Sequence, residues 1–390
     1  MGHARRQLQQ AHRRQLPEDR RPACRLPVRG AQVVQDRRQS AGRPQQRHHG
    51  RTGQAVLAGG VEGAGELIPN QTILLRAIAL QEAKLSSEIE NIVTTDDKLY
   101  RALSKEDASV DPSTKEVLFY QDALWYGYQR LKERPLGTGL FVEIANIIKQ
   151  TDAGIRRTPG TKIANSLGEV IYTPPEGETV IRDKLLDLEK YLHDDTDGID
   201  PLVKMAVGHY QFEAIHPFPD GNGRTGRIIN ILYLIERGLL TVPVLYPSKF
   251  IIENKNAYYS GLRGVTENQD WEPWVLYMLE AVEQTALATR GKILAIRELM
   301  REALEEARER LPKNVYSKEL IELIFQQPYC RIKALLDNDI AAQRKTASQY
   351  LRVLEEAGFL TGLKVGREAL YVNERFARGA GQVNASLLHG

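Results

Sequence analysis

The side chains best suited to chemistry are concentrated in residues 216–227, which have the sequence HPFPDGNGRTGR. This segment combines an imidazole (His216), a carboxylate (Asp220) and two guanidinium groups (Arg224 and Arg227) with three glycines. Apolar residues at helical spacing flank it on both sides, so we expect a polar loop set into a buried helical scaffold. Functional side chains are concentrated on loops of this kind. The segment is therefore the first candidate for a functional site.

The three glycines, Gly221, Gly223 and Gly226, have the spacing G-x-G-x-x-G that is also found in dinucleotide-binding folds. That interpretation requires a strand before the glycines and a βαβ unit around them. The apolar residues of 202–212 recur instead at helical spacing. No Gly-Lys-Ser/Thr sequence follows, as a Walker A loop would require. Both interpretations are therefore disfavoured.

A helix that begins near residues 223–225 would make this loop an anion site. Free backbone N–H groups and the helix dipole favour an anion there, and glycine lets a phosphate approach the backbone closely. Arg224 and Arg227 are three residues apart, so both can project from one face and hold a polyphosphate. Asp220 is an oxygen ligand suited to Mg²⁺ beside phosphates. His216 is the natural general base for a hydroxyl nucleophile.

The whole segment resembles the signature H-x-F-x-D-G-N-G-R-x-x-R of the Fic family of nucleotidyltransferases, and it fills every defining position. The resemblance implies an enzyme, a protein adenylyltransferase that moves AMP from ATP to a Ser, Thr or Tyr hydroxyl of a target protein or of itself. By this resemblance His216 deprotonates the hydroxyl, which attacks the α-phosphate, and pyrophosphate leaves. Asp220 holds Mg²⁺.

The resemblance also assigns the residues that bind the nucleotide. Phe218 anchors the loop in the core, the segment 221–223 forms the anion hole, and the two arginines clamp the phosphates. Tyr258 is a candidate neighbour of the adenine, with packing in the core as the alternative. The implied nucleotide-binding set is Gly221, Asn222, Gly223, Arg224, Thr225, Gly226, Arg227 and Tyr258.

A second motif lies about 130 residues upstream, on an amphipathic helical pattern. Residues 86–91, SSEIEN, match the inhibitory motif S/T-x-x-x-E-G/N of the same family. The resemblance implies that Glu90, in a motif that begins at Ser86, reaches the nucleotide site and pairs with Arg227. An arginine so occupied cannot bind the γ-phosphate, which makes the enzyme autoinhibited. An ordinary surface ion pair is the alternative interpretation.

A short β-prone run, Glu169–Tyr172, is closed by two prolines and predicts a hairpin within residues 156–177. In Fic proteins a hairpin flap at this place holds the target segment by strand addition. Val170 and Ile171 are the candidate flap residues.

These observations predict a mainly α protein, with a helical Fic core, a small β-hairpin flap and a C-terminal winged-helix module. We expect an inhibitory helical segment at 65–110, the catalytic core at 111–285, a helical connector at 286–312, the winged helix at 313–375 and a tail at 376–390.

The order of the C-terminal module is helix, helix, helix, hairpin, and residues 344–350 open the helix that DNA readers place in the major groove. However, residues 315–375 carry 9 basic and 8 acidic side chains. This balance disfavours DNA and favours a protein target or homodimer contacts.

The overall charge of +3 hides an asymmetry, because residues 1–60 contain 13 Arg, no Lys and 3 acidic residues. A basic arm for nucleic acid, a disordered tail and a misassigned start are the three interpretations of that segment. The two cysteines are far apart and show no metal-binding spacing. Neither a signal peptide nor an apolar run long enough to span a bilayer is present. We therefore expect a cytoplasmic protein without membrane contacts.

Two other functions remain open at this stage. The same site could remove AMP if Glu90 positions a water, or the chain could be a transcriptional regulator whose core only senses nucleotide. The identity of the target protein cannot be derived from these residues.

Overall fold

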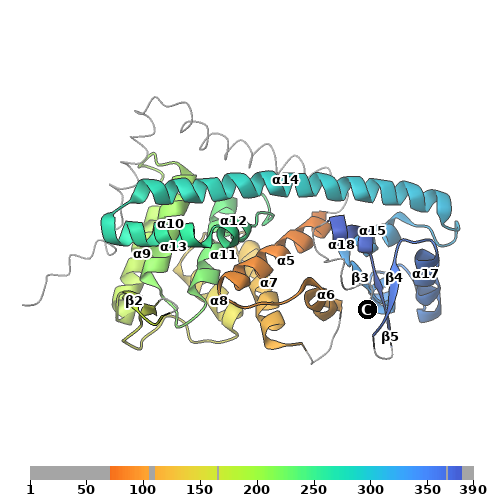
Figure 1. The fold of residues 1–390 in the computed structure, drawn as a ribbon, viewed down its shortest axis with the longest axis horizontal. Coiled ribbons are helices and arrows are strands. Elements are labelled where there is room, and N and C mark those ends of the chain that lie inside the picture. Colours follow the sequence, from red (N-terminus) through yellow and green to blue (C-terminus); the bar gives the residue numbers. More distant parts are fainter. Residues whose placement is uncertain (1–70, 105–109, 165–166, 366–367, 380–390) are drawn as a thin grey trace, which may run out of the picture.

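The structure is a computed structural model that describes residues 71–104, 110–164, 167–365 and 368–379. The described chain is mainly helical, as predicted (Figure 1). The predictions for residues 1–60 and for most of the C-terminal tail fall outside the described residues. The helices are α5 (Gln71–Ile89), α6 (Asp96–Ser104), α7 (Pro112–Arg130), α8 (Thr138–Lys149), α9 (Glu178–His193), α10 (Pro201–Ile215), α11 (Asn222–Glu236), α12 (Ser248–Glu253), α13 (Lys255–Asn268), α14 (Trp271–Arg310), α15 (Lys318–Gln326), α16 (Ile332–Asp337), α17 (Arg344–Glu356) and α18 (Glu374–Gly379). The strands are β1 (Ile163–Ala164), β2 (Val170–Tyr172), β3 (Tyr329–Cys330), β4 (Thr361–Val365) and β5 (Glu368–Val372).

Helices α10 and α11 form the centre of the core, and the polar segment joins them. α10 starts with Asp200, whose side chain accepts from the Leu202 N–H, and with Pro201 at the first helical position. It ends at His216, whose φ of 48° is left-handed. Gly221 also has a left-handed φ, 79°, and α11 begins directly after it. The two left-handed residues reverse the chain, so that α11 packs along α10.

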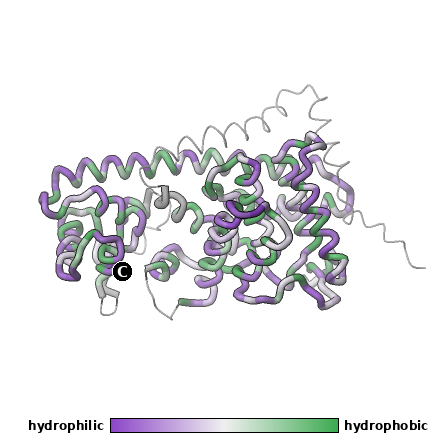
Figure 2. The backbone as a smooth tube through the Cα atoms, turned by 180° about the vertical axis from the view of Figure 1, so that it is seen from behind, coloured by the Kyte–Doolittle hydropathy of each residue, from purple (hydrophilic) through white to green (hydrophobic). Residues whose placement is uncertain are grey.

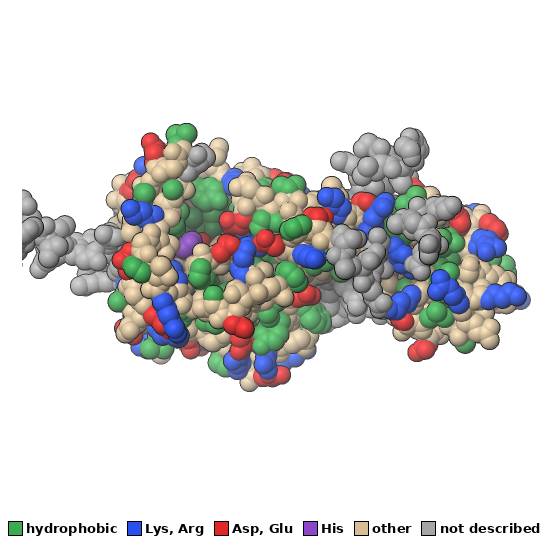
Figure 3. All heavy atoms as spheres, turned by 90° about the horizontal axis from the view of Figure 1, so that it is seen from below, with side chains coloured by type: hydrophobic (Ala, Val, Ile, Leu, Met, Phe, Trp, Pro, Cys, Tyr) green, Lys and Arg blue, Asp and Glu red, His purple; other side chains and the backbone are tan. Residues whose placement is uncertain are grey.

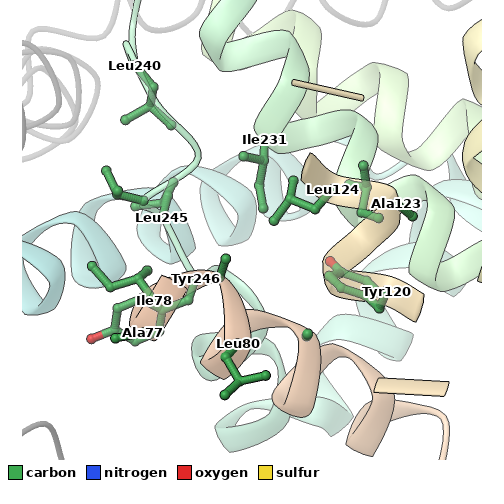
Figure 4. Close-up of a cluster of buried hydrophobic side chains, with 14 of the residues drawn as sticks. Ala77, Ile78, Leu80, Tyr120, Ala123, Leu124, Ile231, Leu240, Leu245 and Tyr246 are labelled. Atoms are coloured by element: carbon green, nitrogen blue, oxygen red, sulfur yellow. The ribbon is translucent and has the colours of Figure 1, made fainter. Parts of the chain in front are cut away.

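Helix α5, which carries the inhibitory motif, is part of the hydrophobic core. Its apolar side chains pack against α7, α11 and the segment after α11 (Figure 4). The buried Glu82 of α5 accepts hydrogen bonds from the Tyr120 hydroxyl (3.0 Å) and from the Ser248 hydroxyl (2.6 Å) and N–H (3.1 Å). Because a buried carboxyl group is tolerated only with such partners, Glu82 fixes the position of α5 between α7 and α12.

Helix α14 runs along the length of the molecule for 40 residues (Figure 1). Apolar and polar residues alternate along it (Figure 2), and its second half buries residues 293, 296, 300, 303 and 307 at helical spacing. The sequence had indicated a boundary between core and connector at residues 285–286. The structure has one continuous helix there, so the connector is an extension of a core helix.

The C-terminal module has the predicted order of three helices and a hairpin, α15, α16, α17 and then β4–β5. Strand β3 completes an antiparallel sheet of order β3-β5-β4, and α18 follows. The ring of Tyr329 in β3 stacks on Tyr100 of α6 with 5.2 Å between centroids. The module thus packs on α5 and α6. None of the helices described is long and apolar enough to span a membrane.

Two neighbouring leucines of α9 test this core. Leu185 is completely buried, whereas the adjacent Leu186 is exposed. We expect Leu185→Ala to lower the free energy of unfolding by about 2–5 kcal/mol, because it leaves a cavity. Leu186→Ala should change it by less than about 0.5 kcal/mol. Urea denaturation followed by circular dichroism measures both, and similar losses in the two variants would contradict this packing of α9.

Candidate active site

His216 lies at the junction of α10 and the loop, where its N–H donates to the Phe212 carbonyl. Burial, followed by the nearby positive charge of Arg156, lowers the pKa of His216 to about 4. The imidazole is therefore neutral at physiological pH and can accept a proton. Its Nδ1 atom is buried, which leaves Nε2 as the nitrogen that can reach a substrate.

Asn222 holds the loop closed from the first position of α11. Its side-chain oxygen accepts from the Phe218 N–H and its amide donates to the Phe218 carbonyl, both at 2.8 Å. Phe218 itself is buried, in agreement with its expected role as an anchor. The resemblance had placed Asn222 in the anion hole, but its side chain is used for the loop. Only its backbone N–H is left for an anion.

Arg227 is buried and is bound by α5. Its Nε donates to the Ser86 hydroxyl (2.7 Å), and its Nη2 donates to the Ser86 carbonyl (2.9 Å) and to Glu90 Oε1 (2.8 Å). Burial alone raises the pKa of Glu90, but Arg227 outweighs this effect and the pKa lies below its ordinary value. The structure thus contains the ion pair that the inhibitory motif implied.

The Glu90 carboxylate also lies against the backbone at the start of α11. A Cβ atom placed on Gly223 would be 2.3 Å from Glu90 Oε1, so only glycine permits this approach. No described side chain caps this helix end. The carboxylate therefore occupies the helix N-terminus at which an anionic ligand would be stabilised.

Arg224 is held by a second network that the sequence did not predict. Its Nη1 donates to Glu116 of α7 at 2.7 Å. Lys149, at the end of α8, bridges Glu116 (3.3 Å) and Asp220 (2.7 Å). We had expected the two arginines to project together from one helix face. Both are buried and each is paired with a carboxylate of another segment, Arg224 with Glu116 of α7 and Arg227 with Glu90 directly after α5.

Asp220 is an exposed carboxylate of the site, of the kind that suits a divalent cation. Its side chain is exposed to solvent. Partial desolvation raises the pKa of Asp220, but Lys149 and the Gly221 N–H have the larger combined effect, so the pKa lies below its ordinary value. Among the described residues no group of three metal-ligating side chains occurs. One carboxylate with a polyphosphate is, however, a usual environment for Mg²⁺. The residues fit a cation that arrives with a nucleotide.

The flap is present as a short antiparallel pair, β1 with β2. Val170 and Ile171 are both exposed, although they are large and apolar. Tyr172, the last residue of β2, donates from its hydroxyl to the Ala214 carbonyl (3.0 Å), two residues before His216. The flap is thereby tied to the end of α10.

Tyr258 does not lie where a base could stack on it. Its ring is 2% exposed, its hydroxyl is 2.8 Å from His209 Nε2, and it packs against Trp274. The neighbouring Tyr259 is 44% exposed, and Glu90 and Arg227 are among the charges that act on its hydroxyl. Tyr259 is thus the ring on the open side of this helix.

Thr225 and Gly226, which the resemblance included in the nucleotide-binding segment, are buried between helices. A Cβ atom on Gly226 would be 2.6 Å from Glu213 Oε1, so this glycine allows α10 and α11 to approach each other. Burial raises the pKa of Glu213 to about 7.

On the face shown in Figure 3, a histidine side chain lies in a hollow of the helical part, with charged and apolar side chains around it.

The sequence analysis missed three residues of the site, Glu116, Lys149 and Arg156. Each is a single charged side chain on an element distant in sequence from the signature. A charged residue at the buried end of an apolar helix pattern, such as Lys149 after residues 140–148, is the one signal that was available.

Comparison with known proteins agrees with this architecture. The model of the Fic/DOC family N-terminal domain matches residues 54–129, and the model of the Fic/DOC family matches residues 137–234. A third model, described as the C-terminal domain of SoFic-like protein adenylyltransferases, matches residues 299–376.

Individual proteins are similar over shorter stretches. Protein adenylyltransferase fic-1 of Caenorhabditis briggsae is 34% identical over 113 residues, which are 29% of this chain and 21% of that protein. A probable protein adenylyltransferase of Aquifex aeolicus is 45% identical over 69 residues, 18% of this chain and 19% of the relative. The chain thus matches about a fifth of the length of each of these two curated relatives.

A solved structure of Fic-1 from Caenorhabditis elegans superimposes with a TM-score of 0.50 at 20% identity, over 63% of this chain and 71% of that one, and it supports the fold. Together with the complete signature on the α10–α11 turn, the matched models show that the chain contains both Fic/DOC family domains and a C-terminal domain of the SoFic-like type.

Proposed function

We propose that the chain is an autoinhibited protein adenylyltransferase, which transfers AMP from ATP to a Ser, Thr or Tyr hydroxyl of a target protein or of itself. One observation carries the proposal: the Glu90 carboxylate lies on Arg227 and against Gly223 at the start of α11. A helix N-terminus beside a guanidinium group stabilises an anion. A carboxylate of the chain itself at this position competes with a phosphate. The names of the relatives, protein adenylyltransferases, support the reaction class.

In this reaction His216 is the general base. Its neutral Nε2 accepts the proton of the target hydroxyl, and the hydroxyl oxygen forms a bond to the α-phosphorus of ATP. The bond between the α-phosphorus and the bridging oxygen to the β-phosphate breaks, and pyrophosphate leaves with that oxygen. The low pKa of His216 keeps the base unprotonated over the whole physiological range.

The arginines bind the phosphates once Glu90 has moved away. Arg227 already has two hydrogen bonds to Ser86, so it keeps its position when the carboxylate leaves. The Nη2 group that Glu90 releases then becomes available to the γ-phosphate. Relief of this autoinhibition then requires only a displacement of the end of α5, which is held by a hydrogen bond of 2.7 Å from Lys255 to the Ile89 carbonyl.

Mg²⁺ is proposed as the metal that accompanies ATP, and it supplies charge neutralisation on the phosphates when bound. Asp220 is the residue that would hold it. In the structure Lys149 forms an ion pair with Asp220, which keeps the carboxylate ionised. The Asp220 side chain is also exposed to solvent. Its position two residues before the start of α11 places it beside the proposed phosphate site.

The flap is proposed to bind the target segment by main-chain pairing to β2. Such pairing aligns a hydroxyl without demanding much of the target sequence. Val170 and Ile171 provide the exposed apolar contacts. Because Tyr172 bonds to the end of α10, a segment paired with β2 is held at a defined distance from His216.

Replacement of Glu90 tests the proposal. We expect Glu90→Gly to increase the transfer of labelled AMP from ATP to protein by about tenfold or more, because Arg227 is then free for the γ-phosphate. The double variant Glu90→Gly/His216→Ala should show no transfer, because the base is lost. Incubation with labelled ATP, followed by gel electrophoresis, measures both.

Glu88→Gly is the matched control, since it makes the same substitution two residues away and the hydrogen bonds of Arg227 go to Ser86 and Glu90. It should leave transfer at the wild-type level. If Glu90→Gly labels no protein, including the chain itself, the proposal fails. If Glu90→Gly instead stops the release of AMP from labelled protein, the alternative of AMP removal is favoured.

Nucleotide binding tests the assignment of Asp220. In the Glu90→Gly chain, we expect Mg²⁺ to tighten ATP binding in calorimetry by about tenfold, and we expect Asp220→Ala to remove most of that gain because one carboxylate ligand is lost. Binding of ATP in EDTA should be the same in both chains. An equal effect of Mg²⁺ with and without Asp220 would contradict the assignment.

A further inference from the structure

Arg156 is a buried arginine next to the catalytic loop, and neither motif includes it. It is 4% exposed and lies between α8 and the flap. Its Nε donates to the His216 carbonyl at 2.7 Å, and its backbone N–H donates to the Pro217 carbonyl at 2.9 Å. Its Nη2 donates to the Ile215 carbonyl at 3.3 Å and to the Pro175 carbonyl. One residue therefore binds the end of α10, the loop and the base of the flap.

The partners of this guanidinium group are carbonyls. No described carboxylate lies within ion-pair distance of Arg156, and Glu176 acts on it only from further away. The carbonyls of Ile215 and His216 lie at the end of α10, which is the negative pole of the helix dipole. Carbonyls carry only partial charges, so the guanidinium group keeps a net positive charge beside the loop. That charge acts on His216.

We propose that Arg156 is a positioning residue of the transfer reaction: it fixes the His216 backbone relative to the flap and keeps the imidazole in the neutral form that accepts a proton. The inference rests on the proposed function of His216 as a base. It also joins the two halves of the reaction, because the flap presents the hydroxyl and α10 presents the base. Misplacement of reacting groups by about 1 Å can cost a factor of about 100 in rate.

The charges around His216 act in opposite directions. Arg156 disfavours the protonated imidazole, while Glu90 of α5 and Asp220 of the loop favour it, as does the backbone carbonyl of Glu213 on its own helix. Burial also disfavours it and is the largest effect. Neutralising Arg156 removes the only positive charge in this set. The pKa of His216 should then rise, and activity should be lost at a higher pH as the pH falls.

The first test measures the imidazole directly, in the chain with Glu90 intact. Histidine-selective isotope labelling and NMR titration give the pKa of His216, assigned by the signal that is lost in His216→Ala. Arg156→Gln should raise this pKa clearly above about 4. Arg156→Lys, which keeps the charge, should leave it low. The control is Arg157→Gln, since the neighbouring Arg157 is 77% exposed in its side chain and is paired with Glu178.

The second test uses the Glu90→Gly chain and follows AMP transfer against pH. Arg156→Gln should shift the acid limb of kcat/KM to higher pH. Arg156→Lys should keep the limb in place but lower kcat by about tenfold or more, because an ammonium group cannot make the forked contacts to three carbonyls. The Kd of ATP should be unchanged in both.

An unchanged pKa of His216 in folded Arg156→Gln overturns the electrostatic role, and wild-type kcat in Arg156→Lys overturns the positioning role. If Arg156→Gln does not fold, the kcat of Arg156→Lys decides. The NMR titration needs no transferase activity, so failure of the inference is distinguishable from failure of the proposed function.

Discussion

A buried guanidinium group needs a hydrogen-bond acceptor for each of its donors, and Arg227 obtains its acceptors from α5. This requirement joins the catalytic loop to a helix that lies 130 residues earlier in the chain. The helix can supply Ser86 and Glu90 only because Glu82 and the apolar residues around it fix α5 in the core. The Glu90–Arg227 contact and the hydrophobic core therefore depend on each other. A nucleotide phosphate would satisfy the same donors of Arg227 that Glu90 now satisfies.

The sequence was sufficient for the parts of the site that are contiguous. The signature and the inhibitory motif are each contiguous in sequence, so the resemblance to the Fic family that they carry was enough to imply the Glu90–Arg227 pair. It could not predict Glu116 or Arg156, because their contacts join residues 108 and 60 positions apart. No local pattern distinguishes such a residue from a solvated charge. Whether Tyr258 or its neighbour Tyr259 is exposed depends on helix rotation, since consecutive residues differ by about 100°.

The fold was predicted well where the apolar periodicity is strong. It was predicted less well where one helix runs through both the predicted core and the predicted connector. The helices on both sides of the loop, the flap and the module order follow from apolar spacing and from proline and glycine positions. The boundary that we placed at residues 285–286 lies within the single helix α14, whose buried apolar residues continue at helical spacing from the core into the C-terminal half. The resemblance placed Asn222 in the anion hole with its two neighbouring glycines. In the structure both polar atoms of its side-chain amide bond to the Phe218 backbone and close the loop.

The continuity of α14 has a further consequence. At about 1.5 Å per residue, a 40-residue helix is roughly 60 Å long. It begins beside α10, where Trp274 donates to the Ala206 carbonyl, and it ends at the C-terminal module. The helix thus fixes the distance between the two ends of the molecule (Figure 1). A macromolecule that contacts both ends at once must span a comparable distance. The length of this helix therefore sets a minimum size for such a molecule, whatever its side-chain chemistry.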